Sequence, residues 1–96
     1  MDISVVNVPD KGRFEGRNAD GELVGVTEYR EVGDIYFFNH TEVEPAFEGQ
    51  GVGSTVIKSA LDEVRSQGKT IVPRCPFVFG FIQKHPEYED IVTNRM

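Results

Sequence analysis

The chain has 96 residues, of which 39% are hydrophobic and 27% charged, and its net charge is −6 at neutral pH. This length predicts a single domain spanning residues 1–96. Ten basic residues are scattered among 16 acidic ones, which argues against nucleic acid as a partner, because phosphate binding needs clustered Lys and Arg.

The chain has neither an apolar run long enough to span a bilayer nor an N-terminal secretory signal pattern. A cytoplasmic protein without a membrane partner is therefore expected. The single cysteine, Cys75, cannot form an internal disulfide and agrees with a reducing compartment.

Three segments that we expect to be extended follow one another in the first half of the chain. They cover residues 11–18, 22–30 and 35–44. Asp20-Gly21 between the first two is a strong hairpin signal, and Gly33-Asp34 marks a second tight turn. We therefore predict a three-stranded antiparallel meander.

The third of these strands becomes polar toward its end. Strict alternation places the side chains on two faces, one with Tyr36, Phe38, His40, Glu42 and Glu44, the other with Ile35, Phe37, Asn39, Thr41 and Val43. Because both faces begin apolar, we expect the start of the strand to be covered on both sides and its polar end to lie near a ligand. Pro45 should end the strand with a break or bulge that exposes main-chain groups.

Residues 47–54, FEGQGVGS, contain three alternating glycines just before an amphipathic segment. The apolar residues from Val52 to Val64 recur on one face, which predicts a helix over residues 51–67 that ends at Gly68. Without β-carbons, the main chain at a helix N-terminus can bring unpaired N–H groups close to an anion. The stretch suggests a phosphate cradle, although alternating glycines also occur in plain turns.

The last third of the chain predicts a strand and a short helix. Residues 69–72 should form a strand parallel to the third one, because a strand-helix-strand unit makes a right-handed crossover. A short, mostly buried helix should open at Pro76, with Phe77 and Phe81 one turn apart, and one further turn is expected at residues 88–92. The predicted fold class is α+β with a mixed sheet.

Four short motifs occur in order along the chain. They are HTEV at 40–43, EGQGVG at 48–53, VPRCPFV at 72–78 and HPEY at 85–88. Together they resemble the GNAT acetyltransferase superfamily, whose signature is Gln or Arg, two residues, Gly, one residue, and Gly or Ala, and in particular its minimal YjdJ-type branch. The resemblance covers roughly residues 11–92 and implies a truncated GNAT-like fold.

Two features depart from the superfamily pattern. Glu48 stands where Gln or Arg is favoured, which places a negative side chain near the expected pyrophosphate. A full-length member also has helices between its first two strands and further strands at its C-terminal end, where this chain has an Asp-Gly turn and a ten-residue tail. The acceptor site is therefore expected to be open or completed by a partner.

The resemblance implies acetyl-CoA as the cofactor. Its pyrophosphate would bind main-chain amides of the glycine stretch, and its pantetheine arm would follow the splayed edge of the third strand. The cofactor-binding residues implied in this way are Thr41, Val43, Gly49, Gln50, Gly51, Val52, Gly53 and Ser54.

Acetyl transfer requires a neutral acceptor amine. For a lysine-like amine with a pKa of about 10.4, neutralisation near pH 7 costs roughly 4 kcal/mol. We expect His40 to act as the base, directly or through water, with Glu42 orienting it or acting instead. Cys75, at the mouth of the last helix, would protonate the departing CoA thiolate or briefly accept the acetyl group.

Each of these residues also has a plainer interpretation. His40 would then be a partly buried, hydrogen-bonded side chain, Glu42 a solvated carboxylate and Cys75 a buried structural cysteine. A metal site built on His40, Glu42 and Glu44 is not predicted, since no Cys or His pair has the close spacing of a zinc site.

The sequence thus predicts an N-acetyltransferase that moves an acetyl group from acetyl-CoA to an unidentified amine by direct attack in a ternary complex. The expected partners are acetyl-CoA and a small-molecule or protein amine, and the chain is expected to be a monomer or weak homodimer. A non-catalytic acyl-CoA-binding or regulatory module is one alternative. A structural or interaction domain, whose glycines serve only the turn, is another.

Overall fold

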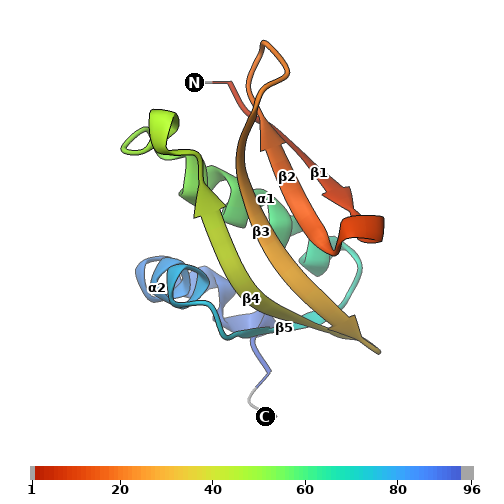
Figure 1. Ribbon diagram of the computed structural model, residues 1–96. Helices are drawn as coiled ribbons and strands as arrows, with labels where there is room; N and C mark the ends of the chain where they lie inside the picture. Colours follow the sequence, from red (N-terminus) through yellow and green to blue (C-terminus); the bar gives the residue numbers. More distant parts are fainter. Residues whose placement is uncertain (1, 94–96) are drawn as a thin grey trace.

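The computed structural model of the chain describes residues 2–93, which form one mixed sheet with helices on one face (Figure 1). The strands, in sheet order, are β1 (Ser4–Val8), β2 (Arg13–Arg17), β3 (Leu23–Val32), β4 (Ile35–Val43) and β5 (Thr70–Pro73). The α-helices are α1 (Val52–Ser66) and α2 (Pro76–Lys84), and the short 3-10 helices are η1 (Pro9–Lys11), η2 (Pro45–Phe47) and η3 (Pro86–Ile91). The first four strands are antiparallel neighbours and β5 runs parallel to β4, so the predicted α+β fold is confirmed.

Strand β1 is an element that the sequence analysis did not predict. It pairs with β2 from Ser4↔Arg17 to Val8↔Arg13, and η1 connects the two strands. The sheet therefore has five strands rather than four. The hairpin around Asp20 joins β2 to β3, so it does not link the first two strands of the chain.

Helix α1 packs closely on the sheet because two glycines face it. Gly16 of β2 and Gly25 of β3 lie opposite each other. A β-carbon on Gly16 would lie 2.7 Å from Val56, and one on Gly25 would lie 2.9 Å from Val52. In Figure 1, α1 accordingly runs directly behind the central strands, and no described helix crosses the near face of the sheet. This near face is called the uncovered face below.

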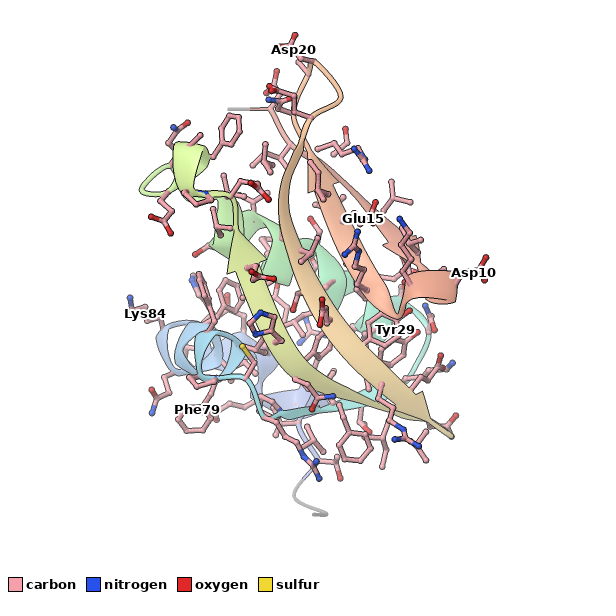
Figure 2. All side chains as sticks on the ribbon, in the orientation of Figure 1. Asp10, Glu15, Asp20, Tyr29, Phe79 and Lys84 are labelled. Atoms are coloured by element: carbon pink, nitrogen blue, oxygen red, sulfur yellow. The ribbon has the colours of Figure 1, made fainter. Side chains whose placement is uncertain are left out.

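Helix α2 packs on the same side as α1. Its buried residues are Val78, Phe81 and Ile82, which follow the spacing of one helical face and join the core that contains the aromatic cluster of the sheet. The prediction of a mostly buried helix is wrong for Phe77, which is 44% exposed, whereas Phe81 is buried. Phe79 is also exposed, and Figure 2 shows it pointing outward from α2. Among the described residues, no helix has the length and apolar composition needed to cross a membrane.

Strand β4 contains a bulge. Glu28 of β3 pairs with His40, whereas the next β3 residue pairs with Phe38, so Asn39 is an extra residue. Because one extra residue reverses the two faces, the predicted alternation is wrong beyond Phe38. The helix-covered face carries Tyr36, Phe38, Thr41 and Val43. The side chains of His40 and Glu42 lie on the uncovered face.

Strands β4 and β5 separate halfway along β4. Their pairing runs from Ile35↔Thr70 to Phe38↔Pro73. The last link is the N–H of Cys75, which donates to the carbonyl of Phe38 at 2.9 Å. Beyond this point β4 pairs only with β3, so residues 39–43 have a free edge.

Candidate functional site

The loop before α1 presents a row of main-chain N–H groups. Gly49 and Gly51 have φ angles of 82° and 76°, a region that side chains other than glycine rarely adopt. Gly51 is the N-cap residue, and no side chain caps the helix. Within residues 2–93, no hydrogen bond is donated by the amides of residues 49–54, and the Thr55 amide is the first to find an acceptor, the Gly51 carbonyl at 3.1 Å. These free donors sit at the positive end of the α1 dipole, where an anion is favoured.

A cavity of about 620 Å³ opens in front of these donors. Its walls come from the loop, the first turn of α1, the free stretch of β4, the neighbouring part of β3, and α2. All of the predicted cofactor-binding residues line it except Gln50. The volume lies within the range of about 300–1,000 Å³ that is common for small-molecule sites.

Phe77 is a cavity residue that the sequence analysis did not identify. Its ring lies so close to Gly53 that a β-carbon on Gly53 would overlap it. The third glycine is therefore needed for contact between α1 and α2 rather than for a positive φ angle. The sequence signal for Phe77 was its place in the motif VPRCPFV, directly after Cys75 and Pro76.

The free edge of β4 offers main-chain groups to a second partner. The N–H of Glu44 donates to the carbonyl of Val24 at 2.9 Å, so the main-chain groups of Glu44 face β3. Because these groups alternate along a strand, those of Thr41 and Val43 face the free edge. An extended ligand can pair with such an edge as an added strand would.

His40 and Glu42 are neighbours on the uncovered face. His40 Nε2 lies 3.3 Å from Glu42 Oε1, and the two side chains are 55% and 68% exposed. The partly buried histidine considered above is therefore not what the structure shows. Both side chains are accessible from solvent, and the carboxylate lies within ion-pair distance of the imidazole when the imidazole is protonated.

Cys75 lies on the other side of β4, at the N-cap position of α2. The residue is 4% exposed, and its Sγ donates to Thr41 Oγ1 at 3.4 Å. The structure thus brings His40 and Glu42 together but does not place Cys75 with them. The free edge of β4 runs between the two groups.

The charge around the cavity is mostly negative. Glu42, Glu44 and Glu48 line it, and the one basic lining residue among residues 2–93 is Arg13. Arg13 binds the carboxylate of Glu15, with Nη2 2.7 Å from Oε2. Figure 2 shows Glu15 on β2, and its side chain is only 7% exposed. The cavity therefore has little free positive charge from side chains.

The hydrogen bond from Arg13 lowers the pKa of Glu15, against the opposing effect of burial, and a second hydrogen bond from Arg17 acts in the same direction. Arg17 Nη2 lies 3.1 Å from Glu15 Oε1. Glu15 is thus a structural carboxylate held by two guanidinium groups.

Known proteins resemble the chain in sequence family and in fold. The model of the GCN5-related N-acetyl-transferase family matches residues 13–91. No curated protein matched the sequence. Among solved structures, a GCN5-like putative N-acetyltransferase from Staphylococcus aureus is 21% identical with a TM-score of 0.71, and the match covers 97% of this chain and 90% of that one.

Two longer enzymes share the fold at lower coverage. The ribosomal-protein-S18-alanine N-acetyltransferase of Escherichia coli is 20% identical with a TM-score of 0.57, over 62% of this chain and 38% of that one. The PaiA N-acetyltransferase of Thermoplasma acidophilum, solved in complex with coenzyme A, is 15% identical with a TM-score of 0.56, over 78% and 48%. This chain therefore spans less than half of either enzyme. Because the family model covers most of its length, the chain belongs to the GCN5-related N-acetyltransferase family.

Proposed function

We propose that this protein transfers an acetyl group from acetyl-CoA to an amine. The observation that carries the proposal is the row of unpaired amides at residues 49–54, which opens onto a cavity that continues along the free edge of β4. A diphosphate needs convergent donors, and an extended arm with amide groups needs a strand edge. The cavity offers both.

The chain's own residues suit the two ends of such a cofactor. The amides from Gly49 to Ser54, including that of Gln50, would hold the pyrophosphate, and the main-chain groups of Thr41 and Val43 would pair with the pantetheine arm. The coenzyme A complex of the Thermoplasma neighbour supports this choice of cofactor by analogy. When bound, acetyl-CoA supplies an acetyl group activated as a thioester.

The positions of the predicted catalytic residues suit direct attack. An acceptor amine that approaches over the uncovered face meets His40, which takes its proton while Glu42 orients the imidazole. The new N–C bond forms as the C–S bond of the thioester breaks. Cys75, on the opposite side of β4, gives its proton to the departing sulfur. Base and acid are thereby kept apart by the strand edge that holds the reacting group.

The uncovered face leaves room for the acceptor. No described helix packs there, and the side chains of His40 and Glu42 are accessible from solvent. We therefore place the acceptor on this face of the sheet. An open site of this kind suits either a small amine or an amine on a protein surface.

A titration of isotope-labelled protein with CoA tests the binding step. Amide shifts should change most at residues 41–54. Gly53→Ala should weaken binding about tenfold or more, because its new methyl group displaces the Phe77 ring that lines the cavity. Gly80→Ala is the matched control, since its β-carbon would meet no atom within 4 Å. Shifts that are absent or centred elsewhere would refute the proposed site.

Release of free CoA in the presence of a panel of amines tests the transfer step. Two observations favour a second candidate, a non-catalytic acyl-CoA-binding module: the carboxylate of Glu48 lines the cavity, and the acceptor face is open. Binding without release of CoA for any amine would support this module. Amine-dependent release would support the transferase.

A further inference from the structure

Thr27 is a buried polar residue whose role the fold alone does not explain. It lies on β3 with 0% exposure, on the face that packs against the helices. Its Oγ1 is 2.9 Å from Thr41 Oγ1, and Thr41 in turn accepts the hydrogen bond from the Cys75 thiol. Val would have nearly the same shape and would fill this strand position without a hydroxyl to satisfy. The hydroxyl therefore needs another explanation.

The bulge at Asn39 creates this contact. Without the extra residue, alternation would turn His40, not Thr41, toward the helix-covered face. Thr27 and Thr41 are directly opposite each other, and the main chain of Thr41 faces the free edge, so the two form a non-hydrogen-bonded pair. Side chains in such pairs approach most closely. The bulge thus brings two hydroxyl groups and one thiol together where β4 and β5 separate.

We propose that Thr27 and Thr41 are positioning residues for Cys75, which form a hydroxyl pair able to stabilise both the thiol and the thiolate of that residue. The proposal rests on the role given to Cys75 in the proposed function. Hydroxyl groups can donate or accept and rotate to suit their neighbours. A chain of two hydroxyls can therefore reverse its direction when the thiol loses its proton.

In the resting state, the thiol donates to Thr41 and Thr41 donates to Thr27. During transfer, the S–H bond of Cys75 breaks, its proton joins the sulfur of the departing CoA, and Cys75 keeps the electron pair. Thr41 then turns its O–H toward the thiolate, and Thr27 donates to Thr41. The proton that His40 has taken from the amine passes to solvent and a solvent proton returns to Cys75, which restores the resting state.

The share of Cys75 present as thiolate provides a test that needs no cofactor. The chain has one cysteine, so the ¹³Cβ shift of labelled cysteine followed against pH has a single source. At a fixed alkaline pH, Thr41→Val should lower the ratio of thiolate to thiol about tenfold, since a hydrogen bond to a charged acceptor is stronger than one to a neutral acceptor. Thr27→Val should lower the ratio by a smaller factor, about threefold, and Thr27→Ser should restore it.

Thr70→Val is the matched control. It removes a hydroxyl from β5 at the end that pairs with Ile35, away from Cys75, and should leave the ratio unchanged. If Thr27→Val and Thr41→Val both keep the wild-type ratio, the hydroxyl pair is only a packing feature and the proposal is wrong. Should Thr27→Val fail to fold, Thr41→Val decides, because Thr41 is only half-buried.

Measurements of kcat and of the KM for acetyl-CoA test the hydroxyl pair separately from acetyl transfer. If the protein transfers acetyl groups, Thr27→Val should lower kcat and leave the KM for acetyl-CoA unchanged, because Thr27 lies outside the cavity lining. An equal loss in Thr27→Val and Thr27→Ser would indicate a structural effect and contradict the proposal. A changed thiolate ratio in a protein that transfers no acetyl group would refute the proposed function but uphold the hydroxyl pair.

Discussion

The two halves of strand β4 have different surroundings. Residues 35–38 pair with β3 on one edge and with β5 on the other. The side chains of Tyr36 and Phe38 are buried in the hydrophobic core. Residues 40–43 pair only with β3, and their side chains are exposed or half-buried. The first half, called the closed half below, is part of the core, and the second half, called the open half, borders the cavity.

The bulge at Asn39 marks the boundary between these halves. On one side of it, every main-chain group has a strand neighbour, which favours stability. On the other side, main-chain groups at the free edge face the cavity, which favours ligand binding. A strand can therefore combine a rigid anchor with an open edge when one extra residue and a diverging neighbour separate the two.

Phe38→Ala should have the largest effect on stability. The side chain is 0% exposed, and truncation leaves a cavity that lowers the free energy of unfolding by about 3–5 kcal/mol. Urea denaturation measures this change. Phe79→Ala is the control, since that ring is 52% exposed and its loss should change stability by less than about 1 kcal/mol. Similar losses of unfolding free energy for both variants would mean that the closed half does not contribute more to stability than the protein surface does.

In the open half, His40→Ala should lower activity strongly and change stability very little. General-base catalysis contributes about 10²–10⁴-fold, so kcat should fall at least about a hundredfold, while the free energy of unfolding changes by less than about 0.5 kcal/mol. Steady-state kinetics and urea denaturation measure the two effects. His85→Ala is the control, because His85 follows α2 at its C-terminal end and pairs with Glu87 instead of Glu42, so kcat should stay normal. A normal kcat in His40→Ala would remove His40 from the mechanism.

Local sequence patterns predicted most of the elements. The hairpin signal at Asp20-Gly21, the apolar face of α1 and the glycine at position 68 all mark structure that forms from neighbouring residues. Strand β1 was not predicted, although Val5, Val6 and Val8 favour a strand.

The site was predictable where it depends on one continuous stretch. The glycine loop forms from neighbouring residues, and nearly all of its predicted members line the cavity. The bulge at Asn39 was not predictable, because it arises from the register between β3 and β4 and no local pattern marks it. The contacts of Thr27 and Phe77 likewise join elements far apart in the chain.

A substitution at Glu15, on the uncovered face of β2, should have a smaller effect. The hydrogen bond from Arg13 lowers its pKa despite burial, so the folded state holds this proton less tightly than the unfolded chain does. The resulting stabilisation is present above the unfolded value of about 4.5 and is lost as the pH falls through the lower folded value.

Glu15→Gln should therefore lower the free energy of unfolding at pH 7 by about 1–2 kcal/mol, because a buried charged acceptor is replaced. The difference from wild type should shrink as the pH falls below about 4.5. Urea denaturation between pH 7 and pH 3 checks this, and parallel curves for the two proteins would contradict it. A normal kcat in the variant would also show that this carboxylate supports the face without taking part in transfer.

Glu48→Gln should give the smallest effect, at the mouth of the cavity. The carboxylate of Glu48 lines the cavity near the proposed pyrophosphate position, so its removal should tighten CoA binding about threefold to fivefold at low ionic strength. The gain should decrease in high salt, because exposed charges are screened. Calorimetric titration measures both. Asp10→Asn makes the same change in net charge on η1, outside the cavity lining, so an equal gain there would assign the effect to overall charge. A gain confined to Glu48→Gln would show instead that the main-chain donors of residues 49–54 bind the phosphates against a local repulsion from the Glu48 carboxylate.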